Sequence, residues 1–161
     1  MSGIKLLEAQ TPDLVFLDIE LGMSTGLELL SFFEKPAFEV IFITAYEDYA
    51  VKAFRTIATD YLLKPIDIDE LRDAILKVKE KIFSNIDLAI KSLEQIEEKD
   101  FNIENIKNSL MSIADSLENR GALLHPIRYA LSGLSKSPDP FIIASILGKN
   151  KTKKRLKNAI N

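Results

Sequence analysis

The sequence contains no cysteine and a single histidine among its 161 residues. Disulfide bonds and thiolate metal sites are thereby excluded, and a zinc site has no support, because proteins hold zinc mainly through these two residue types. The chain also lacks any run of about 18 apolar residues, and it does not open with a basic segment followed by an apolar one. We therefore expect no membrane-spanning helix and no secretory signal, and a soluble, cytoplasmic protein.

What the sequence does contain is enough apolar material for a folded core. Hydrophobic residues make up 47% of the chain, which argues against intrinsic disorder. A chain of 161 residues fits one ordinary domain or two small ones. Residues 1–85 carry 9 Lys and Arg against 15 Asp and Glu, whereas residues 86–161 carry 12 against 9. An acidic first part and a basic second part indicate two units with different partners.

Three short apolar runs in the first part are separated by amphipathic stretches of helical period. Runs that are rich in β-branched and aromatic residues are typical of buried parallel strands, so the predicted order alternates strand and helix. In such a sheet the carboxyl ends of the strands share one edge, where ligands bind. The runs are Asp13–Asp18, Glu39–Thr44 and Asp60–Pro65.

Each run ends at a residue suited to phosphoryl chemistry. Asp18 ends the first run, Thr44 the second, and the pair Lys64-Pro65 the third. One carboxylate, one hydroxyl and one ammonium group are therefore expected to converge at the edge of the sheet. This combination suits an aspartate that accepts a phosphoryl group.

The sequence after the third run predicts helices. A long amphipathic helix, capped by Asp67 or Asp69, either runs straight into the second part or bends near Ser84 and Asn85. A further helix is capped by Asn102. The predicted fold is an α/β first part with parallel strands, followed by an all-α helical bundle.

The last third of the chain contains residues that typically start helices, end them or form turns. Gly121 is expected to stop a helix, and Pro126 is expected near the start of the next one. The cluster "SKSPDP" predicts a turn, and "PFIIASILG" and "NKTKKRLKNAI" predict two final short helices.

Residues 4–82 resemble the receiver domain of bacterial two-component response regulators. The motifs that carry the resemblance are "LVFLDIELGMSTGLELL", "VIFITAYEDYAVKAF" and "ATDYLLKPID". The last two look most like the subclass that usually drives a LytTR-type DNA-binding output. The resemblance implies a partial flavodoxin-like fold, a phosphorelay role and a sensor histidine kinase or an output module as partner.

Transferred by position, the resemblance assigns a role to each residue at the predicted sheet edge. Asp18 matches the phosphoacceptor, which is also a ligand of Mg²⁺. The backbone carbonyl of Glu20 matches a second contact to that ion. The remaining matches are Thr44 (switch hydroxyl), Tyr61 (aromatic switch), Lys64 (cation that pairs with the phosphoryl group) and Pro65 (shape of the loop).

The sequence departs from the receiver pattern before the first run. A complete receiver has two more strands there and an acidic pair that holds Mg²⁺, whereas "MSGIKLLEAQTP" matches only the end of a helix. One carboxylate and one carbonyl make a weak Mg²⁺ site, so we expect impaired phosphorylation. We also expect the first run to form an exposed sheet edge, through which two copies pair as a homodimer.

From about Ile86 to Ile160 the chain resembles the C-terminal anticodon-binding domain of bacterial glutamyl-tRNA synthetase. The motif is "GALLHPIRYALSGLSKSPDPFIIASILGKNKTKKRL". By position, His125 and Arg128 match contacts to anticodon bases, and the loop that lies against these bases is matched by Ser137, Pro138 and Pro140. The resemblance implies binding to the anticodon arm of a tRNA, with the lysines after Gly148 adding a salt-sensitive contribution.

A synthetase also needs a catalytic domain with its HIGH and KMSKS signatures. Neither is present, and "LSKSPD" lies in the anticodon-domain turn rather than in a catalytic site. We therefore expect no aminoacylation, no catalytic residues and no enzymatic activity.

Several of these residues have structural explanations that the sequence leaves open. The alternative for Tyr61 is a packing role if phosphorylation is lost. The alternative for His125 is a polar helix cap, and the alternative for Arg128 is an ion pair, for example with Glu118. The basic residues from Lys149 to Lys157 are more typical of a solvated helix face than of an RNA-binding surface.

The sequence thus predicts a receiver-like domain over residues 1–83 and a helical anticodon-binding-like domain over residues 84–161. Three functional hypotheses follow. The chain is a phosphorelay receiver with degenerate chemistry, a tRNA-binding module, or a chimeric fold with no retained activity.

Overall fold

The computed structural model describes residues 3–10, 12–22, 24–33, 36–46, 58–117, 120–134 and 137–161. The chain divides into two compact units, Met1–Glu80 and Lys81–Asn161. Helix α4 (Ile68–Glu94) contributes residues to both of them. The boundary predicted after residue 83 falls inside this helix and stays a prediction.

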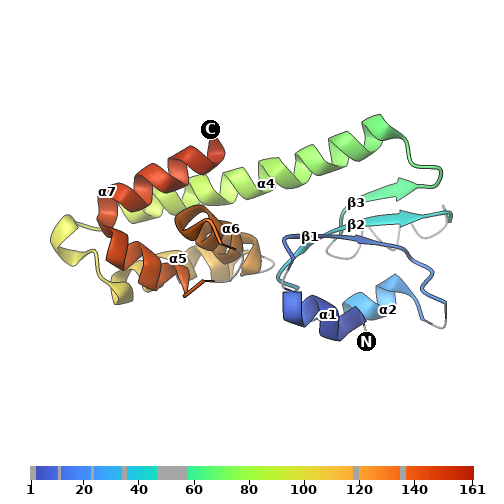
Figure 1. Cartoon of the computed structure of the whole chain (residues 1–161), viewed down its shortest axis with the longest axis horizontal. Helices are drawn as coiled ribbons and strands as arrows, with labels where there is room; N and C mark the ends of the chain where they lie inside the picture. Colours follow the sequence, from blue (N-terminus) through green and yellow to red (C-terminus); the bar gives the residue numbers. More distant parts are fainter. Residues whose placement is uncertain are drawn as a thin grey trace. The chain divides into compact units, whose positions relative to one another are not determined.

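A parallel sheet organises the first unit (Figure 1). It consists of β1 (Leu14–Leu17), β2 (Glu39–Thr44) and β3 (Ala58–Leu63), in that spatial order. Both strand pairs are parallel. The predicted α/β class and the positions of the apolar runs are confirmed, although β3 begins and ends two residues earlier than its run.

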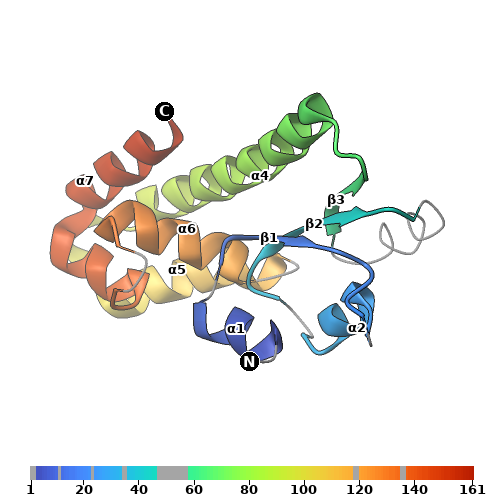
Figure 2. The ribbon, with the colours of Figure 1, turned by 45° about the vertical axis from the view of Figure 1, so that its right-hand side comes forward.

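Helices lie on both faces of this sheet (Figures 1 and 2). On one face are α1 (Gly3–Gln10) and α2 (Gly26–Ser31), and on the other is the first part of α4. The face toward α1 and α2 is the apolar one. Its fully or largely buried residues are Leu17, Ile19, Leu30, Phe38, Val40 and Phe42.

The face toward α4 combines apolar packing with an ion pair. Ile41 and Leu62 are buried there, as is Ala74 on the helix. Lys77 of α4 reaches Asp60 of β3 at 2.8 Å, and this contact raises the pKa of the lysine. Because Asp60 is largely buried at its side chain, the pair ties the helix to the sheet.

Strand β1 forms an edge of the sheet, as expected. It pairs with β2 and with no other strand in the described part of the chain. Phe16 on this strand is 46% exposed. An open edge of this kind can pair with a second chain, and the homodimer stays a prediction.

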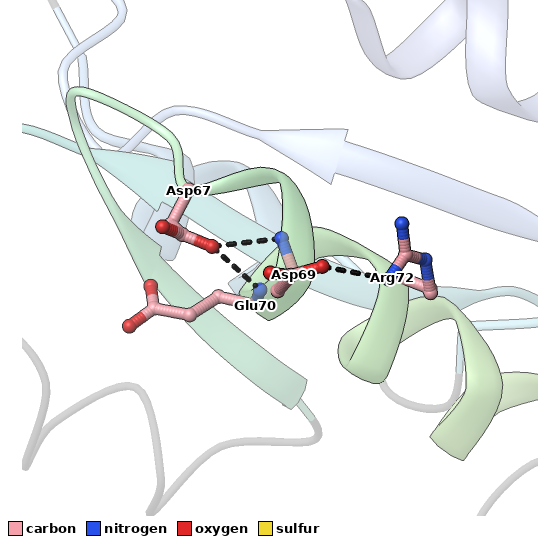
Figure 3. A network of polar contacts seen from close by, with 4 residues as sticks. All are labelled: Asp67, Asp69, Glu70 and Arg72. Atoms are coloured by element: carbon pink, nitrogen blue, oxygen red, sulfur yellow. Dashed lines mark hydrogen bonds and ion pairs between the residues drawn. The ribbon is translucent and has the colours of Figure 1, made fainter.

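The start of α4 is held by a capping aspartate (Figure 3). The Oδ1 atom of Asp67 accepts hydrogen bonds from the backbone N–H groups of Asp69 (2.7 Å) and Glu70 (3.2 Å). Asp69 instead pairs with Arg72 at 2.6 Å. Of the two caps that the sequence allowed, the structure therefore selects Asp67.

The second unit is a bundle built from the last part of α4 with α5 (Ile103–Ser116), α6 (Gly121–Ser132) and α7 (Pro140–Ile160). A short 3₁₀ helix, η2 (Glu98–Asp100), follows α4. The predicted Asn102 cap of α5 is confirmed, since its side chain accepts from the N–H of Asn105 at 3.0 Å. Among the described residues, no helix is long and apolar enough to cross a membrane.

Apolar side chains from all four helices form one core in this unit. Helix α7 is bent at Gly148, whose φ of 74° lies in the left-handed region, so the predicted pair of short final helices is confirmed. The fully or largely buried core residues are Ile86, Ala89, Ile90, Leu93, Ile106, Leu110, Ala114, Leu123, Ile127, Leu131, Ala144 and Leu156.

Two predictions about α6 were wrong. Gly121 is the first residue of the helix rather than a stop, and Pro126 lies in the helix interior rather than near its start. Proline has no N–H to donate to the carbonyl four residues earlier, which belongs here to Ala122. Asn85, a buried residue of α4, donates its side-chain amide to that carbonyl at 3.1 Å. A partner distant in the sequence therefore compensates for the proline.

Helix α4 is continuous through Asn85. The alternative in which the helix runs straight on is thus confirmed, and the bend near Ser84 and Asn85 is not observed. The continuous helix places the Asn85 side chain within the second unit, where it is only 5% exposed. The Asn85 side chain therefore reaches the interior of the second unit because α4 stays helical on both sides of it.

Asn85→Ala is expected to destabilise the second unit by about 1–3 kcal/mol, because it leaves a buried carbonyl without this donor. In a chain that also carries Pro126→Ala, the restored backbone N–H can bond to Ala122, so the cost of Asn85→Ala should fall. Urea denaturation of the four chains of this double-mutant cycle measures the difference. Equal costs in both backgrounds would show that the amide does not substitute for the missing helical bond.

Candidate functional site

Two of the predicted phosphoryl-site residues meet directly at the carboxyl edge of the sheet. Asp18 follows β1 and Lys64 follows β3, and the Nζ atom of Lys64 lies 2.6 Å from Oδ2 of Asp18. Their side chains are 30% and 48% exposed, respectively. Thr44, the last residue of the central strand, is fully buried between them in the order of the sheet. The expected meeting of carboxylate and ammonium is therefore observed, and Thr44 ends the strand that lies between β1 and β3.

The charge of Asp18 is stabilised by its neighbours. The pKa of its carboxyl group is lowered, first by the hydrogen bond from Lys64. Desolvation opposes this effect, while the backbone N–H of Glu20, at 3.1 Å from Oδ1, acts with the lysine. The site thus holds an ionised aspartate that is already paired with a cation.

Gly26 holds the loop that follows Asp18, and the sequence interpretation did not single it out. Its N–H donates to the carbonyl of Ile19 at 2.8 Å. A Cβ atom at this position would lie 2.3 Å from the backbone oxygen of Asp18, so only glycine fits. The preceding Thr25 forms a capping box with Glu28 at the start of α2. The spacing Thr-x-x-Glu was a sequence signal for the start of α2, but not for the close approach of Gly26 to Asp18.

Tyr61 and Pro65 are the other two residues that the receiver resemblance assigns to this edge of the sheet. Tyr61 packs partly against the sheet core, and its hydroxyl donates to the carbonyl of Tyr46. Lys64 extends the ladder by donating its N–H to the Thr44 carbonyl at 2.8 Å, and the Lys64–Pro65 peptide bond is cis. The packing explanation for Tyr61 agrees with this geometry, and its switching role stays a prediction.

The residues around Asp18 do not make a Mg²⁺ site by themselves. Mg²⁺ requires near-octahedral oxygen coordination. Within the described ranges no group of three or more Asp, Glu or His side chains is placed to hold a metal ion. One oxygen of Asp18 is engaged by Lys64 and the other by the N–H of Glu20. The donor set therefore does not fit the ion that the receiver resemblance implies.

The predicted RNA-contacting residues of the second unit lie on α6 and in the segment before α7. His125 and Arg128 are partly buried on α6, Ser137 is partly buried, and Pro138 is exposed. Pro140 is buried as the first residue of α7, where it has little surface to offer a ligand. Glu118, the partner proposed for Arg128, lies outside the described residues.

Most of the basic residues of α7 have partners within their own unit. Lys149 donates to the backbone carbonyls of Glu94, at 3.0 Å, and Ile96, so it caps the end of α4. The Glu94 carboxylate is paired with Lys153 at 2.8 Å and Lys157 at 3.5 Å, and these contacts, chiefly the hydrogen bond from Lys153, lower the pKa of Glu94. These three lysines therefore act mainly in the fold.

Arg155 also has a partner, because it donates to the carbonyl of Leu131. Two lysines of α7 differ from these partnered residues. Lys151 and Lys154 have no hydrogen-bond or ion-pair partner among the residues that the structure describes. The basic tail that the sequence showed as one block therefore separates into a structural set and a smaller set that faces solvent.

Lys64→Met is expected to raise the pKa of Asp18 toward its ordinary value of about 3.9, because the largest stabilising contact is removed. Since the folded-state pKa is lowered, the pair stabilises the fold above the ordinary value, and this contribution is lost as the pH falls through the lowered value. NMR titration of the Asp18 carboxyl carbon measures the shift. Lys151→Met is the matched control and should leave the titration unchanged; an unchanged titration in Lys64→Met would contradict the pairing.

Comparison with known families agrees with the division into two units. Residues 1–76 match the response regulator receiver domain, and residues 48–160 match the anticodon binding domain. The two matches overlap over residues 48–76, the stretch that leads through β3 into α4. Both predicted resemblances are thereby confirmed at the level of the family.

Individual relatives match about half of the chain. An uncharacterized response regulatory protein of Vibrio cholerae is 42% identical over 79 residues, covering 48% of this chain and 33% of its own. The sensory transduction protein LytR of Streptococcus mutans is 45% identical over 80 residues, covering 48% and 33%. The transcriptional regulatory protein BtsR of Escherichia coli is 36% identical over 84 residues, covering 50% and 34%.

The chain spans about a third of the length of these relatives. Their matches cover about half of this chain, whereas the anticodon-binding match, over residues 48–160, covers more than half of it. The chain therefore belongs to the anticodon binding domain family, and its residues 1–76 match the response regulator receiver domain.

Proposed function

We propose that the first unit is a receiver with degenerate phosphoryl chemistry, joined to a second unit that binds a tRNA. The observation that carries the first part is the ion pair of Asp18 and Lys64 beside Thr44. These are the residue types that a phosphoacceptor site uses, at the sheet edge where a parallel fold binds ligands. A sensor histidine kinase or an output module is the partner that this reading supports.

The degenerate character follows from the charge balance at the site. Transfer of a phosphoryl group brings negative charge to an aspartate that is already ionised, and a bound cation normally neutralises it. The described oxygens near Asp18 do not form a metal site, and its own charge is balanced by Lys64. We therefore expect the pair to act as a fixed structural contact, with slow phosphorylation or none, and we expect no catalytic turnover.

The full chain is expected to give the same amide NMR spectrum with and without Mg²⁺ and beryllofluoride, a mimic of the phosphoryl group. A complete receiver measured under the same conditions is the positive control. Shifts confined to the amides of Asp18, Thr44 and Lys64 would contradict the degenerate character and indicate a switch-competent site.

A second function is favoured by a separate observation, the match of residues 48–160 to the anticodon binding domain. The sequence resemblance narrows the ligand to the anticodon arm of a glutamate tRNA. His125 and Arg128 are the residues assigned to bases, and Ser137 and Pro138 lie in the segment assigned to support them. Arginine suits this role because its planar guanidinium group binds a base edge or a phosphate through two parallel hydrogen bonds.

The partners of the α7 lysines decide which of them contribute to RNA affinity. Lys149, Lys153 and Lys157 are engaged with the end of α4. A cation that already balances a carboxylate gains less from a phosphate, because it must give up its first partner. Lys151 and Lys154 have no such cost, so they are the expected source of phosphate contacts.

The double variant Lys151→Gln/Lys154→Gln is expected to reduce the slope of log affinity against log salt concentration by about 1.4, at about 0.7 per lost contact to single-stranded RNA. The matched control is Lys153→Gln/Lys157→Gln, which removes the same charge but should lower the free energy of unfolding while leaving the slope nearly unchanged. Fluorescence anisotropy with labelled glutamate tRNA, between about 50 and 200 mM salt, measures both.

Specificity is tested in the same assay. Arg128→Ala should weaken the binding of glutamate tRNA at every salt concentration and reduce its preference over a tRNA with another anticodon. If the unmodified chain binds no tRNA at low salt, the second function is rejected.

A further inference from the structure

Tyr129 differs from the other aromatic residues of the second unit in its exposure. Phe83, Phe101 and Phe141 are partly buried, and the last two pack against the helical core. Tyr129 is 59% exposed on α6. The core therefore does not account for an aromatic ring at this position.

The helical period places this ring among the residues assigned to RNA. On α6 the positions of His125, Arg128, Tyr129 and Ser132 are spaced by three or four residues, so they share one face. The opposite face consists of Leu123, Ile127 and Leu131, which are fully buried in the core. Tyr129 thus lies one turn along the same surface from His125 and next to Arg128.

The end of α6 continues this surface toward the predicted RNA-binding loop. Gly133, with a φ of 72°, ends the helix in the left-handed conformation. The next residue, Leu134, is also 59% exposed, and its N–H donates to the hydroxyl of Ser132 at 3.1 Å. The side chains of Tyr129 and Leu134 are therefore both exposed near the end of α6, after the residues assigned to base contacts and before the segment at Ser137.

We propose that Tyr129 is a base-stacking residue that holds an unpaired nucleotide of the anticodon loop. The proposal rests on the proposed tRNA function of this unit and adds a contact that the sequence comparison did not assign. Single-stranded RNA exposes the faces of its bases, and proteins bind these faces by stacking aromatic side chains on them. Stacking does not depend on the identity of the base, so Tyr129 supplies affinity while Arg128 supplies discrimination.

The charge around the ring favours RNA as the occupant of this surface. Residues 86–161 carry three more basic than acidic residues, and Lys151 and Lys154 of the neighbouring helix α7 face solvent. Helices α6 and α7 pack against each other within the unit. The unit therefore offers an exposed aromatic ring beside an arginine, and lysines without a partner among the described residues, which are the two features that single-stranded nucleic acids require of a binding protein.

Substitutions that separate stacking from apolar contact test the proposal. In the full chain, Tyr129→Phe keeps the aromatic ring and should bind glutamate tRNA as the unmodified chain does. Tyr129→Leu keeps apolar volume but has no aromatic face, and Tyr129→Ala has neither. Both should weaken binding by roughly 5- to 150-fold, the range that loss of one stacked base implies. Because the side chain is exposed, all three variants should keep the helical circular dichroism and melting behaviour of the parent.

The absence of tryptophan from the sequence permits a direct optical measurement. Tyr129→Trp introduces a single tryptophan at the stacking position, and its emission should be quenched when glutamate tRNA binds. Ile146→Trp is the matched control, since that side chain is 80% exposed on α7. Its emission should change little at the same degree of saturation.

The outcomes distinguish this proposal from the function on which it rests. If the unmodified chain binds tRNA and Tyr129→Ala binds equally well, stacking is rejected and the tRNA function stands. If Tyr129→Leu retains the affinity that Tyr129→Ala loses, the contact is apolar packing and stacking is again rejected. If the unmodified chain binds no tRNA, both are rejected. Loss in the alanine and leucine variants, retention in the phenylalanine variant and quenching of the introduced tryptophan together support it.

Discussion

The hydrogen bond from Asn85 to the carbonyl of Ala122 joins α4 to α6 at the one position of α6 where a proline removes a backbone donor. It allows α6 to continue through Pro126, which would otherwise leave a buried carbonyl without its helical donor. The functional face of α6 lies on both sides of this proline, with His125 before it and Arg128 after it. If the helix ended at Pro126, these two residues would not share one surface, so a structural contact inside the unit also determines the geometry of the face that we propose to bind RNA.

Charge compensation has the same importance in both units. In the first, Lys64 neutralises Asp18 and Lys77 neutralises Asp60. In the second, Glu94 and the carbonyls at the end of α4 engage three lysines of α7. The groups that remain available for ligands are those left over after this internal pairing. The basic charge of the second half of the sequence therefore overstates the number of lysines that are left without a partner among the described residues, because Lys149, Lys153 and Lys157 are engaged in the fold.

The comparison of sequence and structure separates local signals from tertiary ones. The apolar runs predicted the strands, and the polar residues at their ends predicted the meeting of Asp18 and Lys64, because parallel strands present their carboxyl ends at one edge. The position of Pro126 was mistaken because proline is a local helix signal, and its compensation by Asn85 comes from a residue on another helix. Gly26 was overlooked for a similar reason, since its neighbour, the backbone oxygen of Asp18, is revealed only by the fold.

Helix α4 joins the two units directly, because its residues belong to the first unit up to Glu80 and to the second unit from Lys81 onward. Its early part packs on the sheet through Ala74 and pairs with Asp60 through Lys77, while its later part supplies Ile90 and Leu93 to the helical core. An amphipathic helix can serve two cores in succession because its apolar period continues unchanged. Each unit then depends on its own section of the helix, so the two proposed functions are separable by substitution of surface residues, whereas cutting the chain within α4 would remove part of a core and disturb both.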